Sequence, residues 1–185
     1  MDIPDLTTYS YEAGKRLLEK RQPKTLKESG QFLTPPAIAR YMAIQLGKIP
    51  ERATILEPAI GSGVLACAVI EELIANNCST ELWLVAYETD PELCELCREV
   101  LAQACQKAEK SGIRIHWQVH QEDFILACLP DPQPSLFNNT HKRRELYDYI
   151  ISNPPYFKLY KEDKRVKAVS GKVKGTRIFI HSSWH

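Results

Sequence analysis

The strongest constraint on the fold is a regular alternation of short apolar segments and longer helical segments between residues 53 and 152. Strands separated by helices of about ten or more residues pair in parallel and are joined by right-handed crossovers. The sequence therefore predicts an α/β fold with a doubly wound parallel sheet. The expected strands are 53–56, 82–87, 112–119 and 147–152, and the expected helices between them include 64–75 and 91–110.

Two further helices are predicted before the sheet. A mildly amphipathic stretch at 11–21 indicates a short helix within a polar N-terminal arm, residues 1–29. Thr34 is expected to be the N-cap of a second helix with Pro35 at its first position, because Thr accepts backbone hydrogen bonds and Pro needs no donor there. This helix is expected to end near Gly47.

The length of 185 residues suits one domain, and 44% hydrophobic residues supply enough apolar material for one core. A net charge of +1 argues against a chain-wide basic surface, although basic stretches at 141–144 and 158–174 could contact phosphates locally. The apolar runs fall far short of the ~20 residues that cross a bilayer, and the acidic N-terminus lacks the features of an export signal. We therefore expect a cytoplasmic protein with no membrane partner.

Six cysteines are expected to be reduced thiols, because they lie in helix-like and strand-like segments of a core-sized domain. Cys94 and Cys97 fall in the middle of a predicted helix, without a second Cys or His pair at the spacing of zinc ligands. His116 and His120 alternate on a predicted strand, where structural histidines are more common than catalytic ones. No metal site is predicted.

Ligand-binding residues are expected directly after each strand, because ligands of doubly wound sheets bind at the carboxyl ends of the strands. Gly61 and Gly63 form a tight turn that permits close approach to a ligand at the positive end of the next helix. Glu88 stands 25 positions after Gly63, where an acidic side chain can accept hydrogen bonds from ribose hydroxyls. Asp90 is expected to cap the following helix.

The third and fourth strands are followed by groups suited to a planar, amine-bearing ligand. Asp123 can accept from an exocyclic amine, and the adjacent Phe124 can pack against a purine. Asn153-Pro154-Pro155-Tyr156 is the most specific motif in the chain, because its prolines form a rigid extended turn whose carbonyls can accept from a ligand. An amide oxygen and a fixed carbonyl then form an acceptor pair for an NH₂ group, and the tyrosine offers a ring face for stacking.

In their order along the chain, these motifs resemble motifs X, I, II, III and IV of the gamma-class adenine-N6 DNA methyltransferases of restriction–modification systems. The resemblance covers about residues 27–160 and is carried by Gly30-Gln31-Phe32-Leu33-Thr34-Pro35-Pro36, Glu57-Pro58-x-x-Gly61-x-Gly63, Glu88, Asp123-Phe124 and Asn153-Pro154-Pro155-Tyr156. It implies the Rossmann-like fold of methyltransferases that use S-adenosylmethionine, with that molecule as cofactor and double-stranded DNA as partner.

The resemblance also implies a role for each motif residue. Phe32 and Thr34 would lie near the methionine end of the cofactor, Glu88 on its ribose, and Asp123 with Phe124 at its adenine. The residues implied along the cofactor are Glu57, Pro58, Gly61 and Gly63. The residues implied to hold a target adenine flipped out of the duplex are Asn153, Pro154, Pro155 and Tyr156.

By the same resemblance, residues 30–175 are expected to be a partial catalytic domain, because relatives continue with further strands and a target-recognition region. The sheet would then be incomplete at its C-terminal end. The tail at 176–185 resembles nothing in the family. Codons that could encode these residues allow, in another reading frame, a sequence that looks like the family's continuation. This indicates a frameshift near Gly175. A cognate restriction endonuclease or specificity subunit is a further expected partner.

Two other functions stay open from the sequence. Protein-glutamine and RNA methyltransferases also use an Asn-Pro-Pro-Tyr turn to hold a planar NH₂-bearing group, but they lack the segment at 30–36 ahead of the glycine turn. The third reading is a non-catalytic remnant that binds S-adenosylmethionine or serves as an interaction module.

Overall fold

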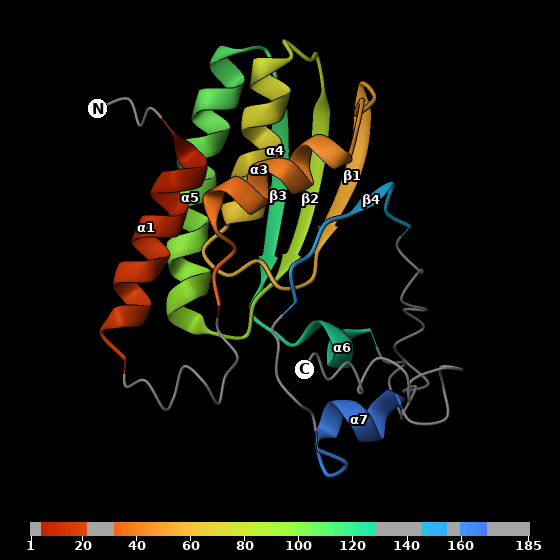
Figure 1. Cartoon of the computed structure of the whole chain (residues 1–185). Helices are drawn as coiled ribbons and strands as arrows, with labels where there is room; N and C mark the ends of the chain where they lie inside the picture. Colours follow the sequence, from red (N-terminus) through yellow and green to blue (C-terminus); the bar gives the residue numbers. More distant parts are fainter. Residues whose placement is uncertain (1–4, 22–31, 129–145, 155–159, 170–185) are drawn as a thin grey trace, which may run out of the picture.

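A computed structural model describes residues 5–21, 32–128, 146–154 and 160–169 of the chain. Its centre is a four-stranded parallel sheet in the order β3-β2-β1-β4 (Figure 1). The strands are β1 (Arg52–Glu57), β2 (Glu81–Tyr87), β3 (Arg114–His120) and β4 (Tyr149–Ile150). The helices are α1 (Leu6–Glu19), α3 (Pro36–Gln45), α4 (Val64–Ala75), α5 (Pro91–Lys110), α6 (Phe124–Ala127) and α7 (Lys164–Val169).

The strand order confirms the predicted doubly wound α/β fold. The chain runs outward from β1 through β2 to β3 and then returns to place β4 on the other side of β1. Such a reversal opens a crevice beyond the carboxyl ends of the strands. Figure 1 shows α6 and α7 below those ends, so the residues after each strand gather at one edge of the sheet.

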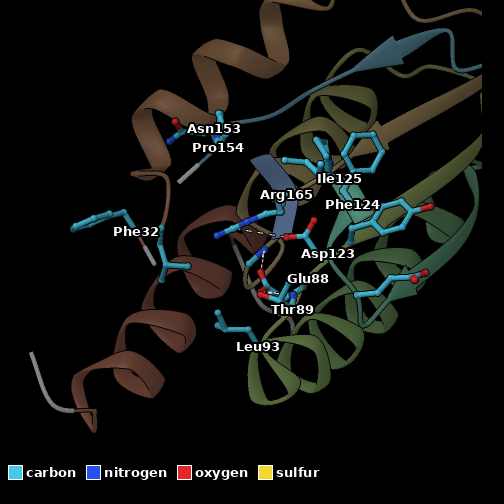
Figure 2. Close-up of a pocket in the computed structure, with 16 residues that line it drawn as sticks. Phe32, Glu88, Thr89, Leu93, Asp123, Phe124, Ile125, Asn153, Pro154 and Arg165 are labelled. Atoms are coloured by element: carbon cyan, nitrogen blue, oxygen red, sulfur yellow. Dashed lines mark hydrogen bonds and ion pairs between the residues drawn. The ribbon is translucent and has the colours of Figure 1, made fainter. Parts of the chain in front are cut away.

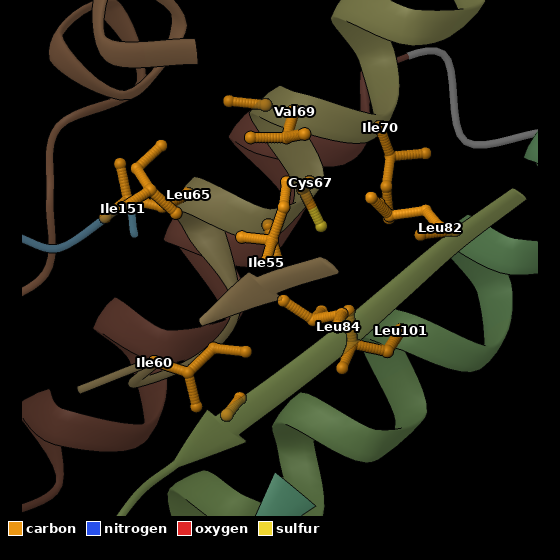
Figure 3. Close-up of a cluster of buried hydrophobic side chains, with 14 of the residues drawn as sticks. Ile55, Ile60, Leu65, Cys67, Val69, Ile70, Leu82, Leu84, Leu101 and Ile151 are labelled. Carbon is orange, nitrogen blue, oxygen red and sulfur yellow. The ribbon is translucent and has the colours of Figure 1, made fainter. Parts of the chain in front are cut away.

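The core lies between the sheet and the packed helices α1, α3, α4 and α5 (Figure 1). Along β2, Leu82, Leu84 and Ala86 are buried, whereas alternate residues such as Trp83 remain half-buried. This period of two is that of a strand with one covered face. Figure 3 shows Leu84 near Ile55 of β1, with Cys67 and Val69 of α4 above Ile55 and Leu101 of α5 next to Leu84.

The first helix begins at Leu6, so the predicted start near residue 11 is wrong. Asp5 caps the helix by accepting a hydrogen bond from the Thr8 backbone N–H at 2.9 Å. Glu71 of α4 accepts from the Leu6 backbone N–H at 2.7 Å, which satisfies a second donor at the helix start. A tertiary partner therefore extends this helix, which packs against α4 and α5.

Other boundaries also differ from the sequence expectation, and β3 begins at Arg114 instead of residue 112. The N-cap of α3 is Pro35 without a side-chain cap, so the predicted capping role of Thr34 is wrong. Strand β4 covers only Tyr149–Ile150 and is therefore shorter than predicted; just before it, the Asp148 carboxylate accepts from the Thr54 backbone N–H at 2.7 Å. Among the described residues, no helix is both long and apolar enough to cross a membrane.

Candidate active site

A cavity of about 310 Å³ opens at the carboxyl ends of the strands. This volume lies at the lower end of the roughly 300–1,000 Å³ range of small-molecule sites. The predicted site residues that line it are Phe32, Pro58, Gly61, Glu88, Asp123, Phe124, Asn153 and Pro154. These residues come from segments that follow all four strands and from the segment before α3, and Figure 2 shows them around one space.

Glu88 is held in place by backbone N–H groups from two loops. Its carboxylate accepts from Gly61 at 3.0 Å, from Thr89 at 2.7 Å and from Asp90 at 2.9 Å. Asp90 caps α5 as predicted, accepting from the backbone N–H groups of the first turn. The acidic group after β2 is therefore fixed against the glycine turn after β1 at the wall of the cavity.

The glycine turn needs its two glycines for backbone conformation. Gly61 has φ +58° and Gly63 has φ +94°, both in the left-handed region that other residues rarely adopt. Gly61 lines the cavity, whereas Gly63 is the N-cap of α4 and is not part of the cavity wall. The second glycine thus shapes the turn behind the wall.

Asp123 and Phe124 stand at the opening of α6. The Asp123 carboxylate caps α6 by accepting a backbone N–H at 3.1 Å, and its other oxygen lies 3.7 Å from the Arg165 guanidinium. The rings of Phe124 and Tyr87 pack edge to face with their centroids 5.2 Å apart. The Tyr87 ring also stacks on the His120 ring, with a centroid distance of 4.8 Å. A carboxylate and an aromatic surface therefore adjoin each other at this end of the cavity.

Asn153 and Pro154 line the cavity, and a long-range hydrogen bond orients the amide of Asn153. Its Nδ2 donates to Oγ1 of the buried Thr34 at 3.1 Å. Thr34 does not line the cavity, but it contacts the side chain of Asn153, which does. Because Nδ2 faces Thr34, the amide oxygen of Asn153 points in a different direction. Pro155 and Tyr156 lie outside the described residues.

Glu57 is, like Gly63 and Thr34, a predicted cofactor residue that does not line the cavity. Its side chain is 1% exposed and accepts a hydrogen bond from the Ala66 backbone N–H. Within the described part of the chain, its Oε2 atom has no hydrogen-bond partner. Burial raises the pKa of Glu57 well above its ordinary value, and the nearby charge of Glu88 raises it further. The neutral form of this carboxyl is therefore favoured.

The cavity also has wall residues that the sequence did not single out. Arg165 of α7 reaches the cavity beside Asp123 (Figure 2). Its hydrogen bond with Asp163 raises the pKa of its guanidinium. Arg165 belongs to the basic stretch at 158–174, for which the sequence leaves open both phosphate contact and a solvated surface. Phe32 lies at the margin of the cavity with 63% of its surface exposed.

Cys94 and Cys97 are expected to bind no zinc. Both are buried in α5, and burial raises the pKa of Cys94 to about 11 and that of Cys97 well above its ordinary value. Zinc binds the thiolate, which these environments disfavour. Elemental analysis of protein purified from zinc-containing medium should find no stoichiometric zinc. One zinc per chain that disappears in Cys94→Ser would contradict this prediction.

Comparison with known proteins identifies the family. The profile described as N-6 DNA Methylase matches residues 4–176. Type II methyltransferase M.BsuBI of Bacillus subtilis is 31% identical over 149 residues, which cover 78% of this chain and 28% of that protein. Type II methyltransferase M.AccI of Acinetobacter calcoaceticus is 28% identical over 141 residues, which cover 75% of this chain and 20% of that protein. The chain thus spans less than a third of the length of either relative.

A solved structure supports the fold. The crystal structure of a putative class I S-adenosylmethionine-dependent methyltransferase from Listeria monocytogenes matches with a TM-score of 0.51 and 20% identity, over 89% of this chain and 44% of that one. At this identity the match speaks for the Rossmann-like fold alone. The profile match covers nearly the whole sequence, including every motif described above. The chain belongs to the N-6 DNA methylase family.

Proposed function

We propose that this chain forms the cofactor site and the target-base site of an enzyme that methylates N6 of an adenine flipped out of duplex DNA. The observation that carries the proposal is the shared cavity. Asn153 and Pro154 line the same space as Glu88 and Asp123, so acceptors for a base amine and acceptors for a nucleoside adjoin each other. The two type II methyltransferase relatives support DNA as the substrate.

S-adenosylmethionine is the cofactor of this family and fold, and the cavity fits it. The cofactor supplies an activated methyl group on a sulfonium. Glu88 is fixed where it can accept from ribose hydroxyls, and Asp123 with Phe124 offers an acceptor and a ring for the adenine. The cavity wall carries the three acidic residues Glu88, Glu122 and Asp123 and one basic residue, Arg165, which is paired with Asp123. The excess of negative charge is complementary to the positive sulfonium.

Asn153 and Pro154 are proposed to activate the amine of the target base. The lone pair of an adenine amine is delocalised into the ring, which makes the nitrogen a poor nucleophile. Hydrogen bonds from its two protons to the Asn153 amide oxygen and the Pro154 carbonyl would draw the nitrogen toward tetrahedral geometry and localise that lone pair. The nitrogen could then attack the methyl carbon in line as the bond from that carbon to sulfur breaks. The leaving group would be the neutral thioether S-adenosylhomocysteine, and the methylated nitrogen would release one of its protons to solvent. The Thr34 contact supports this role because it fixes the amide orientation.

Tyr156 is proposed to hold the flipped base by stacking. The amine of adenine is inaccessible inside a duplex, so the base must leave the stack at a cost of a few kcal/mol. An aromatic ring that stacks on an extruded base offsets about 1–3 kcal/mol of that cost. The proposal rests on the position of Tyr156 two residues after Pro154 in the motif.

Glu88→Ala is expected to weaken S-adenosylmethionine binding by about 1–3 kcal/mol, the cost of leaving hydrogen bonds to a charged group unmade. Calorimetry on the purified chain measures this directly. Glu122→Ala is the matched control, because it removes an equal charge from the same wall. Equal affinity in Glu88→Ala and the parent would reject the ribose role. Equal weakening by both substitutions would assign the effect to charge alone.

The proposed function is tested by transfer of labelled methyl groups to duplex DNA, RNA and protein. Label in DNA that is recovered as N6-methyladenine after digestion supports the proposal. Label in glutamine or in RNA contradicts it and favours the alternative acceptors. Cofactor binding without transfer to any acceptor, in the gene product that carries this chain, would identify a non-catalytic remnant. A neighbouring restriction endonuclease gene would support the proposed restriction–modification partner.

A further inference from the structure

Helix α1 lies directly behind the two loops that shape the cofactor site. The Ser10 hydroxyl donates to the Ser62 backbone carbonyl at 2.8 Å, inside the glycine turn after β1. Both serines are fully buried. Gly61 of this turn lines the cavity, whereas no residue of α1 does. The hydrogen bond from Ser10 therefore connects the turn to a helix outside the cavity wall.

Gly14 allows α1 to approach the cavity wall closely. A Cβ at this position would lie 2.6 Å from the Ser62 hydroxyl oxygen, 2.8 Å from the Ser62 Cβ and 2.7 Å from the Leu33 Cδ1. A glycine inside a helix costs roughly 0.5–1 kcal/mol relative to alanine, so this glycine is tied to close packing. Leu33 lines the cavity, and Ser62 is flanked by Gly61, which also lines it.

The end of α1 is anchored to the second cofactor loop. The Arg21 guanidinium binds both carboxylate oxygens of Asp90, one of them at 2.9 Å, and also binds Glu92. These bonds raise the pKa of Arg21, so the guanidinium stays charged. The Asp90 backbone N–H in turn donates to the Glu88 carboxylate at 2.9 Å. Arg21 is thus two contacts away from the acidic group that faces the cavity.

The start of α1 is fixed as firmly as its end. The Glu71 carboxylate of α4 accepts from the Leu6 backbone N–H and from the Thr7 hydroxyl, each at 2.7 Å. Thr7, Ser10 and Gly14 are all buried and lie on one face at helical spacing. The helix therefore cannot slide without disturbing α4, the glycine turn and the Glu88 loop together.

We propose that α1 is a brace that sets the affinity of the cofactor site, with Ser10, Gly14 and Arg21 as positioning residues that do not touch the cofactor. The proposal rests on the cofactor site and not on the identity of the methyl acceptor. The brace joins the turn after β1 to the loop after β2, and so holds Gly61 and Glu88 in the arrangement that their own hydrogen bond requires. Loss of the brace should therefore lower cofactor affinity before it unfolds the chain.

Gly14→Ala should weaken S-adenosylmethionine binding by at least about tenfold, which corresponds to roughly 1.4 kcal/mol. Calorimetry is done at a temperature where the unfolding curve shows each protein fully folded. Lys15→Ala is the matched control, because it changes the adjacent exposed residue of the same helix. Ser10→Ala removes the hydrogen bonds of the Ser10 hydroxyl to the Ser62 carbonyl and hydroxyl without adding atoms. It tests the same interface between α1 and the glycine turn if Gly14→Ala fails to fold.

A double-mutant cycle separates positioning from a general structural role. Arg21→Gln should weaken cofactor binding in the parent but have little effect in the Glu88→Ala background, because Arg21 acts through Glu88. Equal effects in both backgrounds would overturn the proposal. Parental affinity in Ser10→Ala and Arg21→Gln, with only a lower unfolding temperature, would also overturn it. If the unsubstituted protein binds the cofactor but methylates no DNA, the proposed acceptor is wrong. The proposal about α1 is then still decided by the binding measurements above.

Discussion

Asn153→Ala should slow the methyl-transfer step by about 10²–10³-fold, the usual effect of removing one positioned hydrogen bond that acts in a transition state. The reason is that the Asn153 amide oxygen is proposed to contact the reacting nitrogen itself. Cofactor affinity should change little, because Glu88 and Asp123, which line the cavity, are proposed to provide the acceptors for the nucleoside part. Single-turnover methylation of duplex DNA, together with calorimetry, separates these two quantities.

Asn153→Asp is the matched variant, because it keeps an acceptor oxygen and loses the Nδ2 group that donates to Thr34. It should retain more activity than Asn153→Ala. Tyr156→Phe should be mild, since stacking survives, whereas Tyr156→Ala should weaken capture of the flipped base by about 1–3 kcal/mol. If Tyr156→Phe slowed single-turnover methylation as much as Asn153→Ala, the hydroxyl would take part directly and the proposed division of roles would be wrong.

The parts of the fold that were predictable are those specified by local sequence. Helices α4 and α5 have the bounds that the sequence predicted. In α5 the signal is an acidic N-cap followed by proline at the first position, and the structure has Asp90 and Pro91 in those roles. Parallel pairing followed from the length of the connecting helices alone. Each of these features depends on neighbours within a few residues.

The parts that were not predictable depend on partners far away in the sequence. The start of α1 has a local cap in Asp5, but it is also held by Glu71, which is 65 residues from Leu6. Thr34 precedes a proline and therefore looks like an N-cap, yet its hydroxyl accepts from Asn153, which is 119 residues away. Arg165 reaches the cavity from a helix beyond the last motif. Local pattern could not show these contacts, because only the folded chain brings the groups together.

Glu57 illustrates how a motif residue can be placed differently from what its motif suggests. An acidic residue at the end of a strand, ahead of a glycine turn, looks like a group that faces the ligand. Its side chain instead turns toward α4 and accepts from the backbone N–H of Ala66. Burial by α4 decides this, and the sequence around residue 57 contains no signal for it.

Glu57→Gln is expected to stabilise the folded chain, by an amount that grows with pH. The pKa of Glu57 is higher in the folded chain than its ordinary value of 4.5, so above about pH 4.5 the folded state keeps a proton that the unfolded state releases. The contribution of the buried carboxyl to stability is therefore complete below the unfolded pKa and is lost as pH rises through the folded pKa. The loss amounts to at most ~1.4 kcal/mol per pH unit.

Glutamine has the shape of glutamic acid but cannot ionise, so the substitution should remove this pH dependence. Urea unfolding at about pH 5 and about pH 8 measures it, with Glu109→Gln on the exposed surface of α5 as the control. A constant difference from the parent at both pH values would contradict the buried, neutral carboxyl. Because Glu57 does not line the cavity, cofactor affinity should be unchanged in Glu57→Gln. Weaker binding would instead show that this carboxyl contributes to the cofactor site, either by contact, as its position in the motif implies, or by positioning its neighbours.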